Sequence, residues 1–124
     1  MDKSSTGTAV SELGRKQCQP CAAGTAALSG ERLDEMLAQV PQWQCVENST
    51  KITRTYKFAD WGGAADFACR VADLADREGH HPDIHLSWGK VTIDLSTHKI
   101  KGLSENDFIL AVKIDQMLEG SDLE

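Results

Sequence analysis

The stretch "DIHLSWGKVTIDL", residues 83–95, decides the fold because two runs of alternating residues flank a turn signal. Apolar residues occupy every second position of both runs: Ile84, Leu86, Trp88, Val91, Ile93 and Leu95. Alternation with a period of two is typical of a strand with one buried face. Glycine in the short connection favours a β-hairpin. We therefore expect two antiparallel strands joined by a type II′ loop at Gly89–Lys90, which places Trp88 opposite Val91.

This loop also predicts which polar residues meet. Counting outward along the two strands, His85 faces Asp94, and His81 faces His98 at the open end of the hairpin. Directly opposed side chains in an antiparallel pair have Cβ atoms roughly 5 Å apart. We expect His85 and Asp94 to form a surface pair, and His81 and His98 to meet near the first residues of the last helix.

The segments around this hairpin complete an alternating order of helices and hairpins. Helical spacing of apolar residues predicts helices at about 31–39, 60–79 and 104–119, and alternation predicts a first hairpin at 42–58. The order αββαββα indicates the α+β class, with a four-stranded antiparallel sheet whose one face is covered by helices.

The same pattern predicts a single domain at residues 29–119. Residues 1–28 are rich in Ser, Thr, Gly and Ala and are expected to form a flexible arm, and residues 120–124 an acidic tail. The arm contains "CQPC", Cys18 to Cys21, a pair that can be a redox couple or half of a zinc site. A lone pair in this context is a weak signal, and we expect it to have no catalytic role.

The composition of the 124 residues narrows the class of function. Thirteen Lys and Arg against 19 Asp and Glu leave a net charge of −6, which argues against binding nucleic acid through its phosphates. No apolar run approaches the roughly 18 residues of a membrane span. A cytoplasmic location is the resulting expectation.

Histidines and one aspartate are the candidate catalytic groups. His80, His81 and His98 are expected to converge with Asp107 at the junction of the second hairpin and the last helix. A zinc site is one hypothesis, although adjacent strand residues point to opposite faces and the HExxH spacing is absent. Acid–base catalysis is the favoured hypothesis, because imidazole gives and takes protons near neutral pH.

The spacing of these residues resembles a known family. The order Asp76, His80-His81-Pro82, Trp88, His98 and Asp107 is similar to the signature of bacterial pterin-4a-carbinolamine dehydratases, as are the flanking "EGHHP", "WGKVT", "STHKIKGL" and "NDF". The resemblance covers about residues 30–119. Ile84 and Gly79 depart from some relatives, which have an aromatic residue and an acidic or amide residue at these positions.

The resemblance implies a reaction, a site and partners. The reaction is dehydration of 4a-hydroxytetrahydropterin to quinonoid dihydropterin, which recycles the pterin of aromatic amino acid hydroxylases such as phenylalanine hydroxylase. The pterin is the substrate, and no metal or organic cofactor is implied. The protein is expected to be a homo-oligomer, a dimer or tetramer. The alternatives are an interaction module with a vestigial site and, less favoured, a metal-dependent hydrolase.

The resemblance also implies which residues act. The catalytic residues are His80, His81, His98 and Asp107. The substrate-binding residues are Asp76, His80, His81, Pro82, Trp88, Thr97, His98, Lys99 and Ile100.

Overall fold

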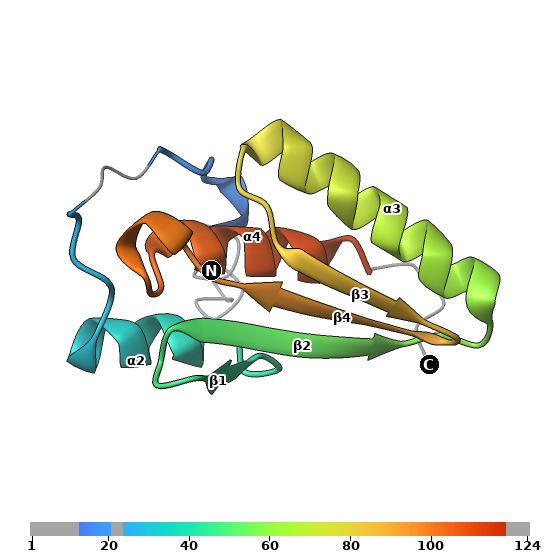
Figure 1. The fold of residues 1–124 in the computed structure, drawn as a ribbon, viewed down its shortest axis with the longest axis horizontal. Coiled ribbons are helices and arrows are strands. Elements are labelled where there is room, and N and C mark those ends of the chain that lie inside the picture. Colours follow the sequence, from blue (N-terminus) through green and yellow to red (C-terminus); the bar gives the residue numbers. More distant parts are fainter. Residues whose placement is uncertain (1–12, 21–23, 119–124) are drawn as a thin grey trace, which may run out of the picture.

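The chain folds as an antiparallel sheet with helices packed on it. The computed structural model describes residues 13–20 and 24–118. Along the chain these form α2 (Gly30–Ala38), β1 (Gln44–Val46), β2 (Lys51–Lys57), α3 (Trp61–Glu78), β3 (Asp83–Ser87), β4 (Lys90–Leu95), the 3₁₀ turn η1 (His98–Ile100) and α4 (Glu105–Gln116) (Figure 1). The order αββαββα and the α+β class are confirmed.

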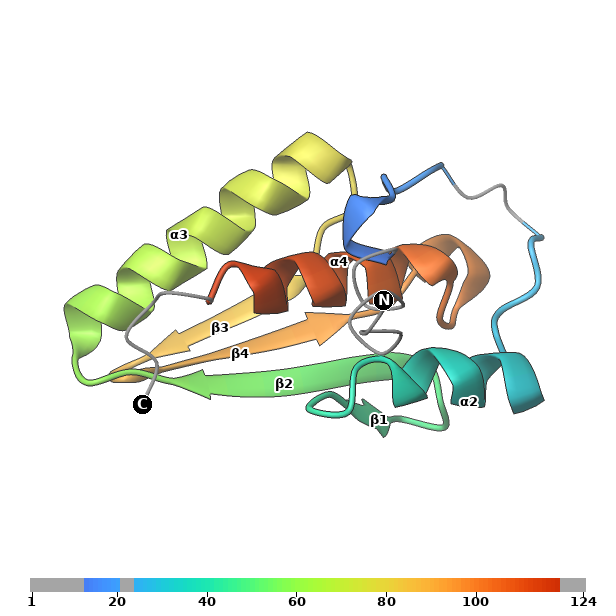
Figure 2. The same ribbon diagram turned by 180° about the vertical axis from the view of Figure 1, so that it is seen from behind.

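The sheet has four strands in the order β1-β2-β4-β3, so β2 lies between β1 and β4 (Figure 2). All neighbouring strands pair antiparallel. Val91, Ile93 and Leu95 of β4 are fully buried on one face. Helices α3 and α4 lie over that face, and Asn106 to Val112 of α4 are all buried (Figure 1). Covering the apolar face of the sheet is what buries the core.

The second hairpin differs from the prediction in its register. Ser87 pairs with Lys90, so the two-residue loop is Trp88–Gly89 and not Gly89–Lys90. Gly89 takes the positive φ of 72° at the second loop position, and its carbonyl accepts a 2.8 Å hydrogen bond from the backbone N–H of Phe58. Both registers keep apolar residues on one face, because they differ by two residues. Alternation alone therefore cannot distinguish them.

The register correction changes the partners of two histidines. His81 no longer lies opposite His98, because β4 ends at Leu95 and His98 begins η1. His85 lies directly opposite Thr92, yet its Nε2 reaches diagonally to Oδ2 of Asp94 at 3.0 Å. The expected contact of His85 with Asp94 is thus confirmed, although as a diagonal pair.

Arg54 lies on the buried face of β2, and its charge is paired there with a carboxylate of α4. Oδ1 of Asp115 accepts hydrogen bonds from the Arg54 guanidinium at 2.7 Å and from the Tyr56 hydroxyl at 2.6 Å. The Trp43 indole donates to the same carboxylate at 3.1 Å. Burial and the adjacent Asp115 carboxylate raise the pKa of Tyr56, which keeps its hydroxyl a donor. The carboxylate therefore joins β2, α4 and the segment before β1.

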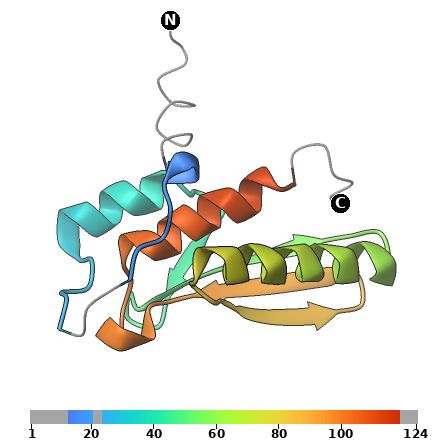
Figure 3. The same ribbon diagram turned by 90° about the horizontal axis from the view of Figure 1, so that it is seen from above.

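Part of the expected flexible arm is packed on the domain. Leu13 is 3% exposed and belongs to the hydrophobic core, and the segment from Lys16 to Pro20 runs alongside the start of α4 (Figure 3). The expectation of a free arm is wrong for residues 13–20, because long-range hydrogen bonds dock them. Cys21 lies outside the described residues. Within those residues, no helix is both long and apolar enough to cross a membrane.

Candidate active site

The end of α3 positions the two adjacent histidines. Gly79 adopts φ 69°, the left-handed conformation that glycine tolerates and that ends a helix. The backbone N–H of His80 still donates to the Ala75 carbonyl at 3.2 Å. Pro82 follows, and β3 begins at Asp83. His80 and His81 therefore lie in the sharp turn between α3 and β3, whereas the sequence analysis expected His81 to continue the strand opposite His98.

Asp107 is the buried partner of His80. Its side chain is fully buried in the first turn of α4, and its Oδ1 lies 2.6 Å from His80 Nε2. Its Oδ2 accepts hydrogen bonds from the Thr97 hydroxyl at 2.8 Å and from the Ser104 backbone N–H at 2.9 Å. An ionised carboxylate can only accept hydrogen bonds, so His80 Nε2 carries a hydrogen. Nδ1 of His80 is then the ring atom that can exchange a proton with a ligand.

The segment from Thr97 to Ser104 closes on itself and holds His98 in place. The backbone N–H of Thr97 donates to the Gly102 carbonyl at 2.8 Å, and Lys101 takes a φ of 54° to close the turn. The Thr97 hydroxyl gives its only hydrogen to Asp107, so the Ser104 hydroxyl, 2.8 Å away, must donate to it. The carboxylate that orients His80 thus also anchors the base of the turn carrying His98.

His81 lies in a more open environment. Its Nε2 is 3.4 Å from Asp76 Oδ1, and the two side chains are 65% and 85% exposed. A pair at this distance and exposure contributes little to stability and leaves the imidazole free to turn. His81 is therefore more accessible than His80, whose side chain is 12% exposed and is held by Asp107.

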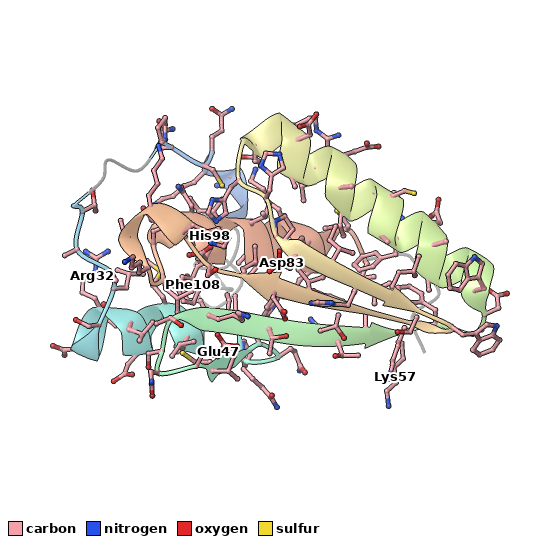
Figure 4. All side chains as sticks on the ribbon, in the orientation of Figure 1. Arg32, Glu47, Lys57, Asp83, His98 and Phe108 are labelled. Atoms are coloured by element: carbon pink, nitrogen blue, oxygen red, sulfur yellow. The ribbon has the colours of Figure 1, made fainter. Side chains whose placement is uncertain are left out.

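One cavity of about 540 Å³ brings the imidazoles together. His98 lies at the end of the sheet where β3 begins, marked by Asp83 (Figure 4). The predicted site residues that line the cavity are Asp76, His80, His81, Thr97, His98 and Lys99. Asp107 does not line the cavity and lies behind His80, which it contacts.

Other predicted binding residues lie away from this cavity. Pro82 and Ile100 do not line it. Trp88 is 69% exposed in the β3–β4 loop. The five residues of β3 separate it from the histidines, which is roughly 17 Å of strand. Within one chain, Trp88 therefore does not share the cavity with the histidines.

Several cavity residues were not predicted by sequence reasoning. The unpredicted lining residues are Cys18, Gln19, Pro20, Arg77, Glu78, Gly79, Ser96 and Asn106. Burial, reinforced by the Glu78 carboxylate, raises the pKa of the Cys18 thiol to about 12. Such a thiol is a poor nucleophile at neutral pH. At Cys18–Pro20 the sequence signal was the "CQPC" motif, and it did not indicate a cavity wall.

A metal site would need several ligating side chains grouped around one point. In residues 13–20 and 24–118, no three His, Cys, Asp or Glu side chains form a group that could hold a metal ion. His80 is paired with Asp107, and His81 with Asp76, in separate contacts. The arrangement is one of imidazole–carboxylate pairs, which suits proton transfer.

The fold and the cavity define a small α+β protein with an imidazole-lined site suited to acid–base chemistry. The sequence profile described as "Pterin 4 alpha carbinolamine dehydratase" matches residues 26–117. The chain belongs to the pterin-4α-carbinolamine dehydratase family.

Curated relatives support this assignment over most of the chain. A protein of Methylococcus capsulatus is 45% identical over 105 residues, which cover 85% of this chain and 92% of the relative. A protein of Rubrobacter xylanophilus is 42% identical over 108 residues, which cover 87% of this chain and 100% of the relative. Both are named "Putative pterin-4-alpha-carbinolamine dehydratase".

Solved structures agree on the fold. A "transcriptional coactivator/pterin dehydratase" from Brucella melitensis is 31% identical with a TM-score of 0.69, covering 73% of this chain and 97% of that one. A pterin dehydratase-like protein described as a RuBisCO assembly factor of the alpha-carboxysome has a TM-score of 0.54. At 19% identity over 61% of this chain and 88% of that one, this second likeness shows the fold alone.

Proposed function

We propose that the protein dehydrates 4a-hydroxytetrahydropterin to quinonoid dihydropterin and water by histidine acid–base catalysis. The observation that carries the proposal is the shared cavity of His80, His81 and His98, with His80 held by the buried carboxylate of Asp107. Family membership supplies the substrate class. A cavity of about 540 Å³ lies within the range of roughly 300–1,000 Å³ typical of small-molecule sites, and a bicyclic pterin fits that range.

The reaction needs two proton transfers and no change of oxidation state. An acid protonates the 4a-hydroxyl as the C4a–O bond breaks, and water leaves. The lone pair of the adjacent ring nitrogen forms the C4a=N bond, and a base removes the proton of that nitrogen. Each positioned proton transfer typically contributes about 10²–10⁴ in rate.

The structure supports distinct roles for the imidazoles. His80, with Nε2–H directed to Asp107, offers the lone pair of Nδ1 and is suited to accept a proton. The exposed His81 and the η1 residue His98 are the candidate acids for the leaving hydroxyl. Asp107 is a positioning residue, since it acts on the ligand only through His80.

The wider setting is part of the same proposal. The reaction recycles the pterin of an aromatic amino acid hydroxylase such as phenylalanine hydroxylase, and we place it in the cytoplasm. No cofactor is required. We also propose a homo-oligomer, a dimer or tetramer. The edge strand β3, with Leu86 38% exposed, supports such self-association.

The proposal is tested by the decay of 4a-hydroxytetrahydropterin, followed by absorbance, with and without the purified protein. His81→Ala and His98→Ala should each lower turnover at least about tenfold. His85→Ala is the matched control, because His85 pairs with Asp94 outside the cavity and should retain wild-type turnover. Wild-type rates in both cavity variants would refute the site.

Two further outcomes separate the alternatives. Activity that a chelator removes and zinc restores would favour the metal-dependent hydrolase. An inactive protein that forms a stable complex with another protein, unaffected by substitution of all three cavity histidines, would favour the interaction module.

A further inference from the structure

The segment Cys18–Pro20 forms part of the wall of the catalytic cavity, although it lies far in sequence from the histidines. All three residues line the cavity that contains His80, His81 and His98. Gln19 and Pro20 also line a second hollow of about 460 Å³ beside the start of α4. The segment is therefore a partition between two hollows, and the cavity would open on this side without it.

The first anchor of this wall is the side chain of Asn106. The backbone N–H of Gln19 donates to Asn106 Oδ1 at 2.9 Å, and Asn106 Nδ2 donates to the Gln19 carbonyl at 2.6 Å. Asn106 is only 8% exposed and lies next to Asp107 in the first turn of α4. A two-point contact to both backbone groups of one residue fixes the position and direction of the chain there.

The second anchor is Glu78, the last residue of α3. Its Oε1 accepts a 2.9 Å hydrogen bond from the backbone N–H of Cys18, and its Oε2 lies 3.3 Å from Lys113 Nζ. Burial opposes ionisation of Glu78, but the hydrogen bonds from Cys18 and Lys113 outweigh it and lower the pKa. The wall is thus tied to the end of α3, which His80 follows, and to α4, which carries Asp107.

We propose that Cys18–Pro20 is a docked wall of the pterin site and that the Gln19 side chain binds the substrate. The inference rests on the proposed function. Gln19 is exposed to the cavity, and its Nε2 makes only a long 3.4 Å hydrogen bond to the Gln17 carbonyl. A side-chain amide carries a donor beside an acceptor. The 2-amino-4-oxo edge of a pterin presents the complementary pair, N–H beside C=O.

A binding role predicts a change in KM more than in kcat. Gln19→Ala should raise KM roughly three- to tenfold, the effect of one neutral hydrogen bond, with kcat within about twofold of wild type. Gln17→Ala is the matched control, because Gln17 lies on the same segment, is exposed and does not line the catalytic cavity. A purely structural cover would not change KM when the exposed Gln19 side chain alone is shortened.

Alkylation of Cys18 gives a readout that does not depend on turnover. The rate at Cys18 is measured by peptide mass spectrometry in a Cys21→Ser background, with the exposed Cys69 on α3 as internal reference. Saturating 7,8-dihydrobiopterin, which has no 4a-hydroxyl to lose, should slow alkylation of Cys18 at least about fivefold and leave Cys69 unchanged. Asn106→Ala should speed alkylation of Cys18 at least about tenfold without ligand, because undocking exposes the thiol.

The outcomes separate this inference from the proposed function. Suppose that the wild type is active, that Gln19→Ala keeps the wild-type KM, and that the ligand does not protect Cys18. This result refutes the role of Cys18–Pro20 as a wall of the pterin site and leaves the proposed reaction standing. An inactive wild type in which 7,8-dihydrobiopterin still protects Cys18 refutes the proposed reaction and supports the wall.

Discussion

Replacing Asp107 by asparagine should reverse the proton arrangement of His80. The carboxylate accepts from His80 Nε2, the Thr97 hydroxyl and the Ser104 backbone N–H. A backbone N–H can only donate, so the oxygen of the introduced amide must occupy the position that Oδ2 holds in the wild type. The amide NH₂ then faces His80, whose Nε2 becomes an acceptor and whose Nδ1 takes the hydrogen. The ring atom proposed to accept a proton from the substrate becomes a donor.

The expected losses in kcat and in the free energy of unfolding follow from these contacts. Loss of the base should lower kcat by about 10²–10⁴, the usual contribution of one positioned proton transfer. The hydrogen bonds from Thr97 and Ser104 change from charged to neutral acceptors, and each loses about 1 kcal/mol. The free energy of unfolding should therefore fall by about 1–3 kcal/mol, which leaves a folded protein.

Three measurements test this prediction together. Steady-state turnover gives kcat, chemical denaturation gives the free energy of unfolding, and long-range ¹H–¹⁵N correlation spectra give the ring nitrogen that carries the hydrogen. Asp94→Asn is the matched control, because Asp94 Oδ2 pairs with His85 Nε2 at 3.0 Å outside the cavity and should not affect turnover. Wild-type kcat in Asp107→Asn, with His80 still protonated at Nε2, would refute the reasoning.

Two other predictions concern the polar contacts that hold the fold. Asp115→Ala removes the shared acceptor of Arg54, Tyr56 and Trp43, and should lower the free energy of unfolding by about 2–4 kcal/mol in chemical denaturation. The control is Asp66→Ala, which breaks only an exposed 3.9 Å pair with Arg70 and should lower the free energy of unfolding by less than about 0.5 kcal/mol. Equal losses of unfolding free energy in Asp115→Ala and Asp66→Ala would contradict this account. Because the pKa of Glu78 is lowered below 4.5 in the folded protein, its stabilising contribution is present above that pH and lost as the pH falls through the folded value. The difference in Tm between wild type and Glu78→Gln should therefore shrink below about pH 4.5, and a difference independent of pH would be inconsistent with an ionised anchor.

The local elements of the fold were predictable because their signals lie between near neighbours. Apolar spacing predicted a helix at about 60–79, and the structure has α3 at Trp61–Glu78 between the caps Asp60 and Gly79. Glycine at position 79 ends α3 directly before His80 and His81. The loop of the second hairpin was predicted wrongly, because a shift of two residues leaves every apolar side chain on the same face.

The candidate site was predicted as a set of residues but not as a geometry. The sequence pattern brought the three histidines and Asp107 into one hypothesis, and the cavity contains all three imidazoles. It did not predict that Asp107 pairs with His80, or that Cys18–Pro20 lines the same cavity. Those relations depend on how α4 and the sheet pack, which no local spacing encodes.

By itself, the sequence determined the order of helices and strands, the class of fold and the histidines that the candidate site brings together, because each follows from periodicity, turn residues or a spaced motif. Only the tertiary structure decided the register of the hairpin, the burial of Asp107 and the docking of Cys18–Pro20. The anchors of that segment join residues 60 and 87 positions apart. Contacts at such separations form only when the packed core brings their elements together, so their energies have no signature in a short stretch of sequence.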